Sequence, residues 1–354
     1  MKTIMKTLLV SIASLSMMFS ANSGELTVNG TAKATYNASS GASTANNGIG
    51  VTNELNFTAS GEMDNGYTWS YSMELDPSTS GTASSTTTAP AGSAINDDTQ
   101  ISLTMNDLGT VKFCVSECAN NKKYAWDQSA YTSMTDTGQS SGIAYPSDES
   151  AYASMQYHTP ELPFGTKASI AYGNGKNDGQ SGNAQGASGK NNMNAYSLVT
   201  APIDGLTISA AYYDVEDYGD GLVAEEQLEE GGSWAASYAT GNFTVGYGKS
   251  FKAPETTTAT RAAGATTVEY YENTGMSVGY AVNDDLSISY TREESEANYQ
   301  TSATVSNDVE MDSIQVAYSL GGATLSVARA DYENVGYELN KDITETIIAM
   351  SFAF

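Results

Sequence analysis

The chain has 354 residues, and its 41 Asp and Glu residues against 15 Lys and Arg give it a formal net charge of −26. This acidity excludes nucleic acid as a partner, because phosphate binding needs a basic protein face. A single histidine, His158, argues against His-based metal sites and Ser-His or Cys-His catalysis, and a hydrophobic content of 40% argues against disorder.

The first residues have the pattern of a secretory signal peptide. Lys2 and Lys6 precede a short apolar stretch, and small residues follow as far as Ser23. The apolar stretch is too short to span a bilayer, which takes about 20 residues. We therefore expect residues 1–23 to be a signal peptide and residues 24–354 to form a single domain. An uncleaved N-terminal anchor is the alternative.

Beyond this segment, apolar and polar residues alternate with a period of two, which is the geometry of a β-strand. In chain order, the apolar side of the alternation consists of Leu55, Phe57 and Ala59; Trp69, Tyr71, Met73 and Leu75; Ile101, Leu103 and Met105; Leu206, Ile208, Ala210 and Tyr212; Phe243, Val245 and Tyr247; Met276, Val278, Tyr280 and Val282; Leu286, Ile288 and Tyr290; Ile314, Val316, Tyr318 and Leu320; and Ile348, Met350, Phe352 and Phe354. Stretches with a helical period are hard to find, so the sequence predicts an all-β fold.

The connections between these strands alternate between short and long. Tight turns are predicted at 64–66, 107–109, 160–165, 202–205, 240–242, 283–285 and 321–322, where Gly, Pro, Asn and Asp gather. Longer segments rich in Gly, Ser, Thr, Asn or acids fall at about 38–49, 77–96, 118–150, 175–190, 217–231, 253–265, 298–306 and 335–341. These seven short and eight long connections imply sixteen strands.

This arrangement predicts a transmembrane antiparallel β-barrel with short periplasmic turns and long extracellular loops. Sixteen strands leave a water-filled lumen. A β-sandwich or β-helix at the cell surface is the soluble alternative, but it does not explain the regular alternation of connection lengths. A β-helix would also show a fixed short repeat, and none is present.

Four segments resemble the Gram-negative general porins. Glu54 to Tyr71 is similar to a strand–turn–strand hairpin of that family, and so are Ser150 to Gly173 and Tyr280 to Tyr290, the last with acids in place of a basic turn. The closing segment, Ile348 to Phe354, resembles the signature by which outer-membrane barrels are recognised for insertion. The motifs are short, but the similarity in architecture extends over the whole of residues 24–354.

The resemblance implies a homotrimer of sixteen-stranded pores, each with its third long loop, 118–150, folded into the lumen. It also implies that Phe352 and Phe354 are read by the barrel-assembly machinery. In the family, an acidic loop faces basic residues of the wall across a constriction.

Strand alternation and this resemblance together select the residues that control passage. Alternation directs Lys33 and Lys112 into the lumen, where they would form the wall side of the constriction. By resemblance, Glu117, Asp127 and Asp136 are assigned to the loop side. An acidic lumen attracts cations, so a weakly cation-selective channel is expected. Alternatively, most acids lie in exposed loops, where salt screens them within about 8 Å.

Cys114 and Cys118 would reach an oxidising compartment, so a disulfide at the root of the third loop is expected. Alternation aims Arg292 and Arg329 outward near the loop side. There they would meet lipopolysaccharide phosphates or be ordinary solvated rim charges.

The sequence thus predicts a porin of the Gram-negative outer membrane, in which small hydrophilic solutes and ions, cations among them, diffuse passively. The partners expected are outer-membrane lipid and lipopolysaccharide. No cofactor, metal or enzymatic activity is expected. The alternatives are a substrate-selective channel on the same fold, a secreted β-rich surface adhesin and, weakest, an outer-membrane hydrolase.

Overall fold

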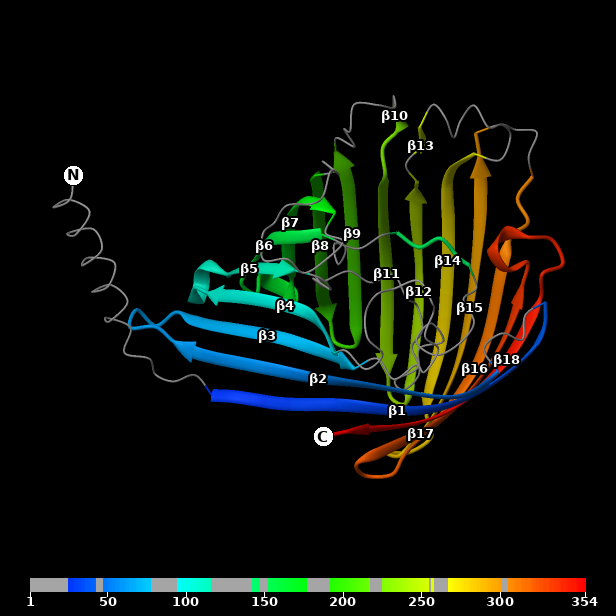
Figure 1. Cartoon of the computed structure of the whole chain (residues 1–354), viewed down its shortest axis with the longest axis horizontal. Helices are drawn as coiled ribbons and strands as arrows, with labels where there is room; N and C mark the ends of the chain where they lie inside the picture. The colour runs from blue at the N-terminus through cyan, green and yellow to red at the C-terminus, as the bar shows by residue number, and fades with distance from the viewer. Residues whose placement is uncertain are drawn as a thin grey trace.

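The computed structural model describes residues 25–42, 47–77, 94–115, 142–146, 152–176, 192–216, 225–254, 256–257, 267–300 and 305–354. Sixteen strands in this part of the chain form one closed antiparallel barrel (Figure 1). They are β1 (Glu25–Gly41), β2 (Gly48–Glu62), β3 (Thr68–Pro77), β4 (Ala94–Thr104), β5 (Thr110–Val115), β6 (Tyr152–His158), β7 (Lys167–Lys176), β8 (Asn192–Ile203), β9 (Leu206–Glu216), β11 (Glu230–Thr240), β12 (Phe243–Ala253), β14 (Val268–Ala281), β15 (Leu286–Tyr299), β16 (Val309–Ser319), β17 (Ala323–Glu333) and β18 (Ile343–Ala353).

Each barrel strand pairs with its neighbours along the chain, and β1 pairs with β18 to close the ring. The strand number, the all-β class and the antiparallel pairing predicted from the sequence are therefore confirmed. The signal peptide predicted over residues 1–23 lies outside the described residues, so it stays a prediction.

The seven tight turns fall where the sequence predicts them. Residues 204–205 show why glycine is needed: Gly205 has φ +78°, and a Cβ atom there would lie 2.2 Å from the carbonyl oxygen of Ala239. A left-handed backbone with no room for a side chain admits only glycine without strain. Two of the seven turns contain short 3₁₀ segments, η1 (Asn106–Leu108) and η3 (Pro163–Gly165).

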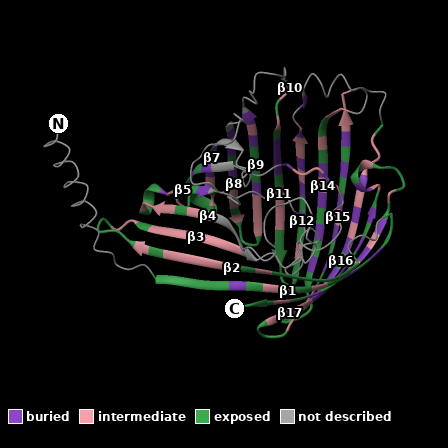
Figure 2. Ribbon diagram, in the orientation of Figure 1, coloured by how far each residue is buried: buried purple, intermediate pink, exposed green. Residues whose placement is uncertain are grey.

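The two faces of the strands differ in burial and in chemistry. On β16, Ser313, Gln315 and Ala317 are buried, whereas Ile314 and Val316 between them are exposed. Figure 2 shows the same alternation along β14 and β15. An outer surface of exposed apolar side chains is unfavourable in water and fits contact with hydrocarbon. The buried parity therefore faces the lumen.

The seam between the first and last strands includes the terminal residue. Main-chain hydrogen bonds join Gly30 and Phe354 in both directions, at 2.7 and 3.0 Å. Gly30 leaves room for the terminal ring, because a Cβ atom there would lie 2.9 Å from Cε2 of Phe354. Phe352 and Phe354 both stand on the outer face, 45% and 68% exposed.

Two short strands outside the barrel, β10 (Glu225–Gln227) and β13 (Thr256–Thr257), form a separate two-stranded sheet. They lie in segments that the sequence assigns to long loops, so this sheet was not predicted. Within the described ranges, no helix has the length and apolar character needed to cross a membrane.

Candidate functional site

The inner wall carries the two lysines predicted to face the lumen. Lys33 lies opposite Ser351 in the pairing of β1 with β18, and it alternates with the outward-facing Ala34. Lys112 lies on β5 opposite Gln156, on the parity shared with the buried Cys114. Three strands, β2 to β4, separate β1 from β5, so the structure does not bring the two lysines together.

Each lysine has polar neighbours on the same face. Lys33 and Glu54 line a hollow of about 580 Å³ at the end of the barrel near the turn 321–322. The Thr31 hydroxyl donates to Glu54 Oε2 across 3.2 Å. Near Lys112, the Nε2 atom of His158 lies 2.8 Å from Oε1 of Gln156. The described wall therefore mixes lysines with an acid and hydrogen-bonding groups.

Part of the third long connection, segment 142–146, lies against the inner wall, where it crosses β12 and β14 in the view of Figure 1. The side-chain amide of Asn273 on β14 donates to the Ala144 carbonyl oxygen across 3.1 Å. The Tyr145 hydroxyl donates to the carboxylate of Glu293 on β15. At the far end of the segment, a Cβ atom on Gly231 of β11 would lie 3.1 Å from Cβ of Pro146.

The contact between Tyr145 and Glu293 is buried. Glu293 is 7% exposed, and a carboxylate removed from water needs donors to offset its desolvation. Burial, followed by the charge of Glu293, raises the pKa of the Tyr145 phenol well above its ordinary value. Tyr145 therefore stays protonated, and so remains a donor, at neutral pH.

The predicted loop-side residues Glu117, Asp127 and Asp136 lie outside the described residues, and so does Cys118. Cys114 is 3% exposed and disulfide-bonded. Because its expected partner is not described, the pairing of Cys114 with Cys118 remains a proposal.

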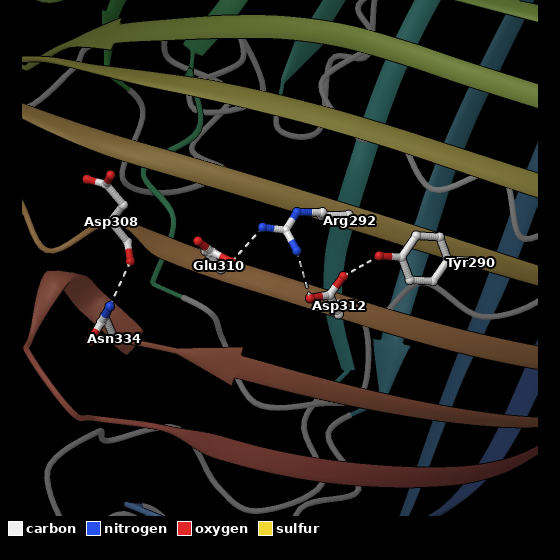
Figure 3. Close-up of polar contacts among 6 residues, drawn as sticks. All are labelled: Tyr290, Arg292, Asp308, Glu310, Asp312 and Asn334. Carbon is white, nitrogen blue, oxygen red and sulfur yellow. Dashed lines mark hydrogen bonds and ion pairs between the residues drawn. The ribbon is translucent and has the colours of Figure 1, made fainter.

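Arg292 stands on the outer face, on the parity predicted from alternation, about midway along β15 (Figure 3). Its guanidinium donates to Glu310 Oε2 at 2.6 Å and to Asp312 Oδ2 at 3.2 Å. The Tyr290 hydroxyl donates to the second oxygen of Asp312. Among the described residues, the ion-pair partner of Arg329, on β17, is Asp331, at 3.3 Å, in a more exposed position. Both arginines thus have carboxylate partners.

The described ranges contain no group of three or more His, Cys, Asp or Glu side chains that could hold a metal ion.

Sequence reasoning missed the residues that anchor segment 142–146: Asn273, Glu293, Tyr145 and Tyr337, whose hydroxyl oxygen accepts from the Ala144 N–H at 3.2 Å. Alternation alone places Glu293 on the inner face, so its orientation could have been predicted from the sequence. Its contact with Tyr145 spans 148 positions in the chain, and that of Asn273 with Ala144 spans 129. No local pattern signals such contacts.

Comparisons with known proteins agree with this geometry. A family model described as Gram-negative porin matches residues 7–340. No curated protein matches the chain at a significant level.

Among solved structures, OmpF from Salmonella typhi in complex with daunomycin has a TM-score of 0.67 and 13% identity over 94% of this chain and 98% of its own. An anion-selective porin from Comamonas acidovorans has a TM-score of 0.66 and 14% identity over 94% and 100%. The outer-membrane channel DcaP of Acinetobacter baumannii has a TM-score of 0.61 and 10% identity over 95% and 99%. At these identities the similarity establishes the fold.

Proposed function

The chain belongs to the Gram-negative porins, non-enzymatic outer-membrane channels for passive diffusion, and from this premise we propose that loop 118–150 narrows its channel and makes it weakly cation-selective. The observation that carries the proposal is the position of segment 142–146 on the inner wall, held by Asn273 and by Glu293. In this proposal, a connection that is anchored on the inner wall at segment 142–146 runs close to the conducting path.

In this proposal, Glu117, Asp127 and Asp136 supply negative charge to the loop side of the constriction. Lys33 and Lys112 supply positive charge from the wall. Carboxylates near a narrow aqueous path raise the local concentration of cations and lower that of anions. Glu54 beside Lys33 adds to the negative side, which supports a weak preference for cations.

The test is single-channel recording in a planar bilayer under a KCl gradient. The wild-type reversal potential is expected to favour K⁺, and D127N/D136N is expected to move it towards zero or towards Cl⁻. The matched control is E225Q/E226Q, which removes the same charge from the segment that contains β10. Equal reversal potentials in all three proteins would contradict a constriction lined by the loop acids.

The assembly and its surroundings form a second part of the proposal. The channel is a homotrimer, so conductance steps should come in multiples of three. Phe352 and Phe354 are recognised by the barrel-assembly machinery, and their position on the outer face keeps them accessible. Arg292 and Arg329 contact lipopolysaccharide phosphates. Each guanidinium would then bind a phosphate and its carboxylate partners at the same time.

The family match decides against the secreted adhesin. The substrate-selective channel remains the alternative within the same fold, and no described feature of the wall favours it.

A further inference from the structure

The loop between β17 and β18 holds an aromatic residue in an unusual backbone conformation. The 3₁₀ segment η4 (Val335–Tyr337) includes Gly336 at φ +68° and Tyr337 at φ +64°. A bulky side chain with positive φ is an outlier, and it persists only where the surroundings enforce it. The contacts of Tyr337 show what enforces it here.

Tyr337 closes a ring of hydrogen bonds around Ala144. The Ala144 N–H donates to the Tyr337 hydroxyl oxygen at 3.2 Å, and that hydroxyl lies 2.6 Å from Ser295 Oγ. Ser295 Oγ donates to Asn273 Oδ1 at 2.5 Å, and the Asn273 amide donates back to the Ala144 carbonyl oxygen at 3.1 Å.

The donor directions in this ring are consistent. The Tyr337 oxygen accepts from Ala144 and so donates its own proton to Ser295, whose proton in turn goes to Asn273. Within the ring, each of the four residues therefore donates once and accepts once, and both main-chain polar groups of Ala144 are used. The Asn273 amide also donates to Ser250 Oγ at 3.0 Å, outside the ring. We call Ala144, Asn273, Ser295 and Tyr337 the Ala144 ring.

Further contacts hold Tyr337, and with it the external loop between β17 and β18, against the wall. Its aromatic ring lies 5.1 Å from that of Tyr271 on β14, and its carbonyl oxygen accepts from the Asn307 amide at 3.2 Å. Next to it, a Cβ atom on Gly142 would lie 2.7 Å from Cα of Gly336. The last long connection and segment 142–146 are thus in direct contact.

We propose that Tyr337 is a positioning residue that couples the external loop 334–342 to segment 142–146, so that the conformation of this loop sets the width of the channel. The inference rests on the proposed function, in which loop 118–150 forms the constriction. A change in the external loop would move the Tyr337 hydroxyl. It would break the hydrogen bond from the Ala144 N–H to this hydroxyl and the hydrogen bond between the hydroxyl and Ser295 Oγ. Ser295 is completely buried, so water does not readily replace that bond.

Asn334 supports the loop 334–342 through contacts that are not part of the Ala144 ring. The side chain of Asn334, itself at φ +51°, donates to the Asp308 carbonyl oxygen at 3.0 Å (Figure 3). Its Oδ1 atom accepts from the Asn340 N–H at 3.0 Å. Asn334 therefore offers a way to loosen the loop without removing any member of the ring.

The test is open-channel current noise in Y337F, which keeps the aromatic ring and removes two hydrogen bonds. Loss of two neutral hydrogen bonds should shift the equilibrium between docked and released states of segment 142–146 roughly 30-fold towards the released states. The released states should be seen as added subconductance steps. The matched control is Y332F. Tyr332 is also inward-facing and 2% exposed, and its hydroxyl has no hydrogen-bond partner among the described residues. Y332F should conduct like the wild type.

Two more variants make the outcome decisive. N334A should add subconductance steps in the same direction and to a smaller extent; wild-type noise in N334A beside a noisy Y337F would overturn the coupling to the external loop. If Y337F does not fold, S295A breaks the same ring and takes its place. A heat-resistant fold in each variant, read from its mobility on gels, separates positioning from general destabilisation.

The same recordings distinguish a failure of the coupling by Tyr337 from a failure of the proposed constriction. Quiet Y337F channels together with a changed reversal potential in D127N/D136N would overturn the role of Tyr337 and leave the constriction in place. No effect in either protein would overturn the constriction itself.

Discussion

Removing the positive charge of Arg292 should destabilise the barrel more than removing that of Arg329. In R292Q, Glu310 and Asp312 lose a partner that now lies 2.6 and 3.2 Å away, and their side chains are only 34% and 40% exposed. In R329Q, one carboxylate loses a partner at 3.3 Å, with side-chain exposures of 59% and 53% in that pair. R292Q therefore leaves two carboxylates without this cation in a less hydrated environment, whereas R329Q leaves one carboxylate in a more exposed environment.

Known magnitudes convert this difference into energies. A solvent-exposed ion pair contributes about 0.2–1 kcal/mol, which is our expectation for R329Q. Breaking a fully buried pair costs about 3–5 kcal/mol because it leaves an uncompensated charge. The Arg292 cluster is partly exposed and faces the membrane, so we expect a loss of roughly 1–3 kcal/mol in R292Q.

The assay is equilibrium unfolding by guanidinium chloride in lipid vesicles, followed by tryptophan fluorescence. An R292Q protein as stable as R329Q at neutral pH would contradict this expectation, since it would show that Glu310 and Asp312 are fully hydrated.

Three further outcomes are expected. Denatured, unreduced protein should bind no thiol reagent if Cys114 and Cys118 are paired, and two labels per chain would refute the pairing. Gly30→Val should slow barrel assembly in vesicles, because the new side chain would occupy the place of the Phe354 ring; assembly at the wild-type rate would contradict the closure at that contact. Tyr145 has a raised pKa, so its stabilisation of the docked segment is fully present below about pH 10 and is lost as the pH rises through the higher folded value. Current noise in the wild type should therefore increase only in strongly alkaline buffer, whereas Y145F should show the same raised noise at every pH; a further rise of the Y145F noise in alkaline buffer would assign the effect to another group.

The sequence was sufficient for the barrel because local signals specify it. Period-two alternation identifies each strand and its lipid-facing side, and turn chemistry at residues such as Gly66 and Gly205 separates the strands. The β10–β13 sheet was missed because segments 225–227 and 256–257 are too short and too polar to show a period.

The site was predicted less completely, since its geometry depends on contacts between distant segments. Parity alone gave the inward direction of Lys33 and Lys112. The partners of Arg292 depend on the register of β15 against β16, in which Arg292 lies opposite Asp312. The Ala144 ring joins Ala144 to Asn273 and Tyr337, 129 and 193 positions away, and nothing in the surrounding sequence of Tyr337 marks it as a contact of Ala144.

The pairing of β1 with β18 has a consequence for the order of folding. Thr31 lies opposite Ala353, so the closing contacts join the two ends of the domain, and loop-closure entropy makes such contacts late and slow. Until they form, both strands present unpaired main-chain groups, which favour association with other chains. The unclosed barrel should thus be its most aggregation-prone form, and it should need a chaperone to shield these edges between synthesis and insertion.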